Sequence, residues 1–125
     1  MTRSLILVGI GSCVGGITRY LTQLFVQKHY PSSFPFGTLS VNVTGCFLIG
    51  IIYALADRGN ILSPAMRLLL ATGFCGGFTT FSSFAYENIS LLRDDEFFYT
   101  SMYILLSVVI GLLAAYLGIL LIKLI

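Results

Sequence analysis

Four long apolar runs, separated by short polar segments, dominate the pattern of the chain. They cover about residues 4–26, 36–56, 64–92 and 97–122. Each run reaches the length of about 20 residues that a helix needs to cross the hydrocarbon core of a membrane. Because the runs leave almost no chain for a soluble domain, the sequence predicts an all-α membrane protein. We expect four transmembrane helices in a single transmembrane domain over residues 1–125.

The third run contains a stretch that is unfavourable for a continuous helix, Gly73-Phe-Cys-Gly-Gly-Phe-Thr-Thr-Phe-Ser-Ser-Phe84. Gly76 and Gly77 are poor helix formers, and the β-branched pair Thr79 and Thr80 follows them. A break at membrane depth leaves backbone groups that lipid cannot satisfy, so it survives only inside protein or beside a polar cavity. We therefore expect the third helix to be broken near Gly76 at mid-membrane, and this break to be the centre of a membrane transport protein.

Composition supports the membrane class and excludes others. The chain is 57% hydrophobic and 10% charged, whereas about 25% charged residues is usual in soluble domains. A net charge of +2 gives no reason to expect nucleic acid as a partner. The sequence holds no Ser/His/Asp set, paired carboxylates, histidine or cysteine cluster, or phosphate-binding loop, so an enzyme is not expected. Four thin, glycine-rich helices cannot easily enclose a pore, which favours an oligomer.

The basic residues favour neither orientation in the membrane strongly. Four helices place both chain ends on one side. The basic residues on that side are Arg3, Arg58, Arg67 and Lys123, and those on the other side are Lys28, Arg93 and, near a helix end, Arg19. This bias is feeble by the positive-inside rule, so the chain is expected to insert both ways up.

Three polar side chains inside the apolar runs have structural and functional interpretations that both stay open. Asn42 needs hydrogen-bond partners at its depth; it bonds a neighbouring helix or offers its NH₂ group to a permeating anion. Arg19 either snorkels to the interface or draws anions into a vestibule. Glu87, the only carboxylate well inside a run, either pairs with Arg19 or acts in gating or ion access.

Two aromatic residues follow the expected break. Phe81 and Phe84 are three residues apart and so share one face of the resuming helix. A phenyl ring has a positive edge, and such edges can hold a small hard anion without the tight binding of a full positive charge. Ordinary packing is the alternative for this pair.

A stripe of small and hydroxyl-bearing residues runs along the fourth apolar segment. Its members recur at steps of three and four and are Tyr103, Ser107, Gly111, Ala114 and Gly118. The stripe is either a packing seam, with its hydroxyls bonded to backbone, or a row of donors beside a pathway.

Taken together, these residues resemble a known family. The stretch from Gly73 to Phe84, with Gly37-Thr-Leu-Ser-Val-Asn42-Val-Thr-Gly45 and Thr18-Arg19-Tyr20, resembles the Fluc (CrcB) family of fluoride channels over essentially the whole chain. The resemblance implies a fluoride-selective channel for passive export of fluoride from the cytoplasm across the cell inner membrane. It also implies an antiparallel, dual-topology homodimer with two pores.

The resemblance further implies roles for individual residues. Phe81 and Phe84 present ring edges to fluoride, Asn42 is the pore amide, and Gly111 stands where some members carry another serine. The hydroxyls of the implied polar track are those of Ser82, Ser83, Tyr103 and Ser107. A structural sodium ion is implied at the dimer centre, held by the backbone carbonyls of Gly76 and Thr79 from both chains; an ordered water is the alternative.

Two other classes compete with a channel. A small antiporter of the multidrug-resistance type would want a carboxylate in the first apolar run and usually tryptophan, and this chain has neither. A non-transporting assembly protein would not need a broken helix with inward-pointing donors.

Overall fold

The computed structural model describes residues 1–59 and 61–125. Their helices are α1 (Thr2–His29), α2 (Phe36–Asp57), α3 (Pro64–Arg67), the π-helix η1 (Leu68–Cys75), α4 (Gly76–Phe78), α5 (Phe81–Arg93) and α6 (Phe97–Leu124). Within the described residues, four helical stretches are long and apolar enough to cross a membrane: Thr2–His29, Phe36–Asp57, Pro64–Arg93 and Phe97–Leu124. The predicted all-helical, membrane-spanning class is therefore confirmed.

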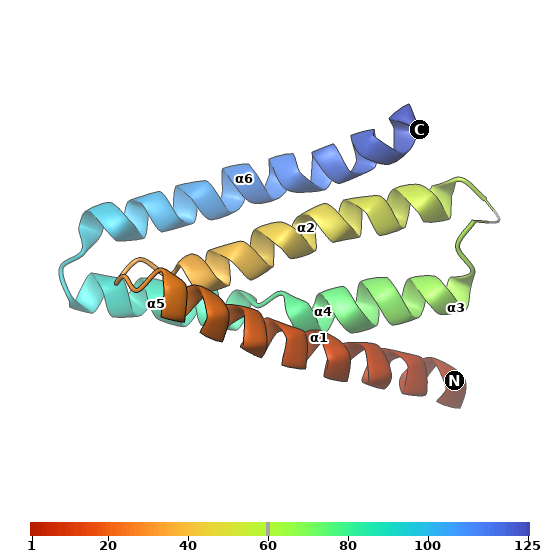
Figure 1. Cartoon of the computed structure of the whole chain (residues 1–125), viewed down its shortest axis with the longest axis horizontal. Helices are drawn as coiled ribbons and strands as arrows, with labels where there is room; N and C mark the ends of the chain where they lie inside the picture. Colours follow the sequence, from red (N-terminus) through yellow and green to blue (C-terminus); the bar gives the residue numbers. More distant parts are fainter. Residues whose placement is uncertain (60) are drawn as a thin grey trace.

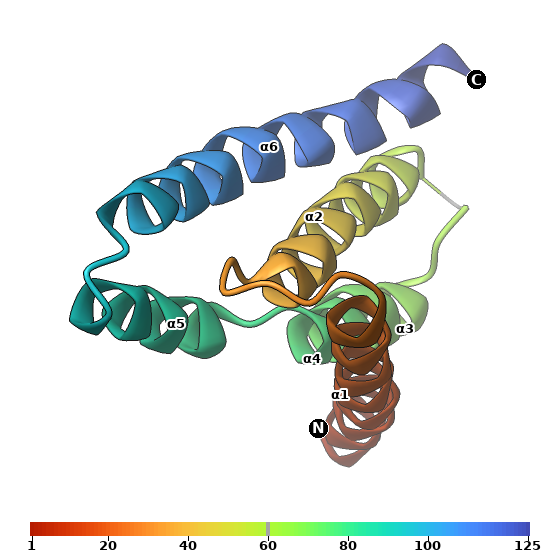
Figure 2. The same ribbon diagram turned by 60° about the vertical axis from the view of Figure 1, so that its left-hand side comes forward.

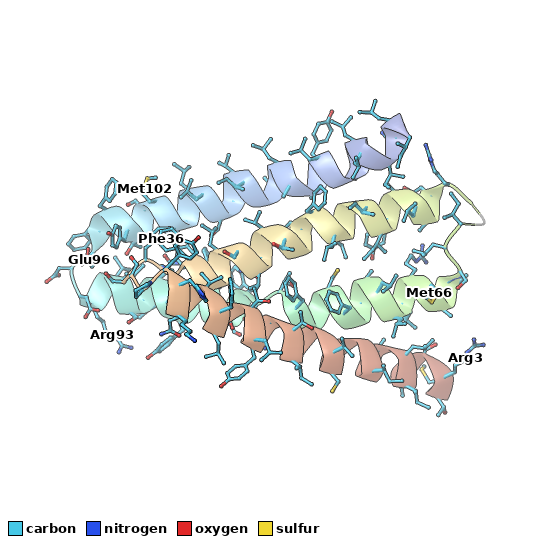
Figure 3. The ribbon with its side chains drawn as sticks, viewed as in Figure 1. Arg3, Phe36, Met66, Arg93, Glu96 and Met102 are labelled. Carbon is cyan, nitrogen blue, oxygen red and sulfur yellow. The ribbon has the colours of Figure 1, made fainter. Side chains whose placement is uncertain are left out.

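The long helices run roughly along one axis, and both chain termini lie at the same end of the molecule (Figure 1). Figure 3 shows Arg3 and Met66 near that end, and Arg93 and Glu96 at the opposite end. Figure 2 shows α6 extending above α2, while α1 crosses below α4. Charged side chains thus lie at both ends of the molecule, where membrane surfaces would lie.

Close packing of α1 depends on two glycines. A β-carbon at Gly11 would overlap the carbonyl oxygen of Leu69, and one at Gly15 would overlap that of Phe74. Gly77 makes the reciprocal contact, because a β-carbon there would stand 2.5 Å from the carbonyl oxygen of Ser12. Gly11 and Gly15, four residues apart, thus let two helix backbones approach closely, as small residues do between membrane helices.

α2 and α6 pack against each other in the same way. A β-carbon at Gly50 would overlap the Ala115 carbonyl oxygen, and one at Gly118 would overlap that of Phe47. Tyr103 and Gly111, on the same face of α6, are also buried. The predicted stripe on the fourth helix is therefore a packing seam along much of its length.

The first half of the third apolar stretch stays helical beyond the expected stop near Gly76. Gly76 is helical, with φ −62° and ψ −37°, and α4 continues to Phe78. The extended residues are instead Thr79 (φ −88°, ψ 157°) and Thr80 (φ −149°, ψ 116°). Contact of Gly77 with α1 compensates for the low helix propensity of the glycines, so the chain leaves the helix at the β-branched pair.

The entrance to this stretch also has a feature that the sequence did not indicate. The helix begins at Pro64, with Ser63 as N-cap accepting a hydrogen bond from the backbone N–H of Met66 at 3.2 Å. From Leu68 to Cys75, however, it has the wider π-helical form, which occurs mostly as single turns within α-helices and often lies at functional sites.

Candidate ion pathway

Asn42 on α2 is hydrogen-bonded to the backbone of the interruption. Its Oδ1 accepts from the backbone N–H of Thr80 at 2.8 Å, and its Nδ2 donates to the carbonyl of Thr80 at 3.0 Å. The side chain thereby satisfies two backbone groups that an extended residue would otherwise leave unpaired. One of the two protons on Nδ2 is used in this way, so the second stays available to another acceptor.

The hydroxyl of Thr80 begins the next helix. It accepts from the backbone N–H of Ser83 at 3.1 Å, which makes Thr80 the N-cap of α5. It also donates to the hydroxyl of Ser83 at 3.1 Å and lies 3.3 Å from that of Ser82. Two predicted track residues are therefore joined to the interruption by short contacts.

These two bonds leave two carbonyls without their usual donors. In a continuous helix, Gly76 would accept from the N–H of Thr80, and Thr79 from that of Ser83. Here the first N–H goes to Asn42 and the second to the Thr80 hydroxyl. No donor among the described residues replaces them, and neutral carbonyl oxygens of this kind suit a hard monovalent cation.

Phe81 and Phe84 lie close together but in different surroundings. Their ring centroids are 5.6 Å apart at an interplanar angle of 42°. The Phe81 side chain is 78% exposed in the single chain. The ring of Phe84 instead packs edge-on against that of Tyr103, with 4.9 Å between the ring centroids. The predicted pair therefore comes together, with one ring packed and the other uncovered.

The structure distributes the predicted site residues over two cavities. One, of about 360 Å³, is lined by Asn42, Gly76, Thr79, Thr80 and Phe81 among others. A second, of about 440 Å³, is lined by Gln23, Thr38, Ser82, Ser83, Tyr86 and Glu87. Phe81 lines the first cavity and Ser82 the second, so both cavities include a residue from the first turn of α5.

Glu87 is held by hydroxyl groups from two other helices. Thr38 on α2 donates to Oε2 at 2.9 Å, and Tyr103 on α6 donates to Oε1 at 3.0 Å. Arg19 is not among its partners, so the suggested Arg19–Glu87 pair is not formed in this structure. Tyr103 has a single hydroxyl proton, and that proton is donated to Glu87. The Tyr103 hydroxyl is therefore not available as the track donor that the sequence suggested.

At its far end, the predicted track contains Ser107, whose hydroxyl has no partner, and Gly111, which has no hydroxyl. The Ser107 hydroxyl is buried and has no hydrogen-bond partner among the described residues. A pure packing seam would have this hydroxyl bonded to a backbone carbonyl, and it is not. At Gly111, one turn farther along α6, an added β-carbon would stand 3.5 Å from the sulfur of Cys46.

Sequence reasoning did not select two members of this site. Thr38 contacts Glu87, and Gln23 donates from Nε2 to the Thr38 hydroxyl at 3.0 Å. A signal existed for both, because Thr38 lies four residues before Asn42 and Gln23 four residues after Arg19. That spacing puts each on the helix face of a residue already singled out.

Comparison with known proteins identifies the family. The model of the CrcB-like protein, Camphor Resistance (CrcB), family matches residues 6–119. The chain belongs to the CrcB family. Its relatives include proteins named fluoride-specific ion channel FluC. That of Chlorobium phaeobacteroides (strain BS1) is 55% identical over 97% of this chain and 94% of its own length. That of Leptospira interrogans serovar copenhageni is 44% identical over 98% of this chain and 96% of its own length.

Family membership confirms two expectations from the sequence. The suspected resemblance is confirmed by the family match and the near full-length relatives. Because these relatives of the CrcB family are named ion channels, the chain is a transport protein rather than an enzyme. Together with its four long apolar helices, this makes it a multi-pass membrane protein.

Proposed function

We propose that the chain forms a fluoride-selective channel for passive export of fluoride from the cytoplasm across the cell inner membrane. The observation that carries the proposal is the cavity shared by Asn42 and Phe81 beside the interruption at Thr80. It combines an amide with an uncommitted N–H and an uncovered aromatic ring. Such groups suit a small hard anion that must be bound and then released.

The pathway that we propose continues from this cavity along neighbouring donors. Ser82 and Ser83 line the second cavity, and the buried Ser107 hydroxyl has its proton available. Phe84 contributes a ring edge beside Phe81. Tyr103 contributes either its ring edge or, after release from Glu87, its hydroxyl. Arg19 is assigned to the vestibule, where its charge raises the local anion concentration.

The assembly that we propose is an antiparallel, dual-topology homodimer with two pores. Its support is the incompleteness of the single chain, in which the glycine surface at Gly76 and the ring of Phe81 are exposed beside the cavity. A second copy related by a two-fold axis in the membrane plane would cover both. This arrangement sets the interruption at mid-membrane, where lipid alone could not satisfy it.

A sodium ion is proposed at the centre of this dimer. The residues present fit it, because the carbonyls of Gly76 and Thr79 have lost their helical donors to Asn42 and to the Thr80 hydroxyl. When bound, the ion would neutralise the partial negative charge of these carbonyls and join the two chains. Four neutral oxygens suit a monovalent rather than a divalent cation, which normally requires carboxylates.

Anion efflux from liposomes tests the proposed function directly. Purified protein in vesicles loaded with potassium fluoride should release fluoride rapidly, once a potassium ionophore balances the charge, without an imposed proton gradient. Vesicles loaded with potassium chloride should retain their anion. Equal chloride release, or release strictly coupled to proton exchange, would contradict a fluoride-selective channel; the latter would favour an antiporter.

A further inference from the structure

Two cavities of the chain meet at one boundary. The wider cavity, of about 520 Å³, opens among residues of the α1–α2 loop such as Ser32 and Ser33. The second, of about 440 Å³, contains Ser82 and Ser83. The residues that line both cavities are Gln23, Thr38, Tyr86 and Glu87. An ion moving from the wider cavity to the serines therefore passes these four side chains.

A directed row of hydrogen bonds crosses this boundary. The amide of Gln23 donates to the Thr38 hydroxyl oxygen at 3.0 Å, and Thr38 donates to Glu87 at 2.9 Å. Tyr103 donates to the other Glu87 oxygen at 3.0 Å. Because a threonine hydroxyl has one proton, the bond from Gln23 to its oxygen favours the orientation in which that proton points to Glu87.

Thr38 differs from other hydroxyls on the helices. The side chains that donate to the carbonyl four residues before them are those of Thr18, Thr22, Ser40, Thr79 and Thr100. Thr38, close to the start of α2, makes no such bond, and its hydroxyl donates instead to Glu87 on another helix. The direction of its proton therefore depends on its neighbours in space.

We propose that Gln23 is the positioning residue of this boundary, holding the Glu87 carboxylate in place through Thr38 and so keeping the passage open to an anion. With a donor on each oxygen, the negative charge of Glu87 is offset and its side chain is immobilised. Without Gln23, Thr38 turns freely and one carboxylate oxygen loses its donor. A mobile carboxylate then repels an anion at the boundary. The inference rests on the proposed function, because it requires an anion to cross there.

The backbone at Gly37 supports this placement. A β-carbon at Gly37 would stand 3.4 Å from the Cα of Gln23 and 3.5 Å from its Cβ and Cγ. The stem of Gln23 therefore lies directly across the start of α2, which brings its amide to Thr38. Thr38 itself is 2% exposed, so water competes little for these bonds.

The test compares fluoride efflux of four single variants with the wild type. Gln23→Met keeps the length of the side chain but removes its donor, and Thr38→Val keeps the shape but removes the hydroxyl. Each should reduce the rate about tenfold, the effect of one hydrogen bond to a charged group. Thr38→Ser keeps the hydroxyl and should stay within about twofold of wild type. Thr22→Val, the matched control for Thr38→Val, removes a hydroxyl on α1 that bonds only the Thr18 carbonyl and lines neither cavity, and should leave the rate unchanged.

A double variant separates positioning from a merely structural role. If Gln23 acts through Thr38, Gln23→Met combined with Thr38→Val should be no slower than Thr38→Val alone. Multiplied losses, or a wild-type rate in Gln23→Met, would overturn the inference. Retention of the wild-type size-exclusion profile excludes misfolding as the cause of a loss. Absence of fluoride efflux from the wild type would instead reject the proposed function, and with it any passage role for Gln23.

Discussion

At the scale of single residues, the site is built from side chains that satisfy backbone groups. Asn42 pairs with both backbone groups of Thr80, and the Thr80 hydroxyl begins α5. Of the two interpretations that the sequence left open for Asn42, the bond to a neighbouring segment is therefore observed. It does not exclude contact with an anion, because one N–H of the amide remains.

Substitution of Asn42 should affect both stability and transport. Asn42→Ala removes the partners of two backbone groups, each costing about 1–3 kcal/mol when buried and unpaired. Asn42→Asp keeps an acceptor for the Thr80 N–H but places a negative charge beside the pathway, so its fluoride efflux should fall further than its stability. The measurements are efflux from liposomes and the thermal midpoint in detergent. Thr44→Ala, at an exposed position on the same helix, is the control, and normal efflux in both Asn42 variants would contradict the role.

The two phenylalanines should be required for flux rather than for folding. Phe81→Ile or Phe84→Ile replaces a polarised ring edge by an aliphatic group of similar bulk. We expect efflux to fall at least tenfold while the protein still purifies as the same oligomer. Phe98→Ile, at a 70% exposed position on α6, should have no such effect. Unchanged efflux in both Phe81 and Phe84 variants would make the pair ordinary packing.

At the scale of elements, the sequence predicted those features that local chemistry decides. The four apolar runs follow from length and polarity, and they form the four long helical stretches of the described residues. The third helix was expected to stop near Gly76, but it continues to Phe78 before the extended residues Thr79 and Thr80, because packing of Gly77 against α1 offsets the low helix propensity of the glycines. The contacts of Gln23 and Thr38 join separate helices, so no local pattern fixes them.

The glycine contact of α1 leads to a stability prediction. A β-carbon at Gly15 would overlap the Phe74 carbonyl oxygen and stand 2.9 Å from the Phe78 backbone nitrogen. These are backbone atoms that cannot rotate away, so Gly15→Ala should destabilise the fold by about 1–3 kcal/mol. Gly9→Ala, which meets no atom within 4 Å, should be neutral or slightly stabilising. Thermal midpoints in detergent measure the difference, and equal midpoints for the two variants would contradict the packing argument.

At the scale of the whole molecule, a single chain leaves its site open. The exposed apolar side chains extend from Leu5 on α1 to Leu124 on α6, and lipid can cover these. Lipid does not suit the uncapped carbonyls near Gly76. In the proposed homodimer, a second copy would cover these carbonyls, while lipid covers the apolar side chains of the outer helices.

The weak charge bias predicts two orientations in one membrane. A cysteine introduced by Asp94→Cys, in the turn between α5 and α6, would report the side on which that turn lies. The background should lack Cys13, Cys46 and Cys75. About half of the chains should react with a membrane-impermeant thiol reagent applied to intact cells or sealed vesicles, and all should react after permeabilisation. Labelling of nearly all or nearly none before permeabilisation would contradict dual topology.

Sodium removal tests whether the two chains share a cation. The carbonyls of Gly76 and Thr79 lack helical donors because Asn42 and Thr80 redirect two N–H groups. In an antiparallel dimer, these oxygens from both chains would converge, and without a cation their partial negative charges would repel one another. Protein prepared in N-methylglucamine should therefore lose fluoride efflux and regain it with sodium, but not with the larger potassium ion. Asn42→Ala frees the Thr80 N–H, so it should weaken the dependence of efflux on sodium and also lower the rate of fluoride efflux. Full efflux after verified removal of sodium, with the dimer intact, would instead favour an ordered water at this position.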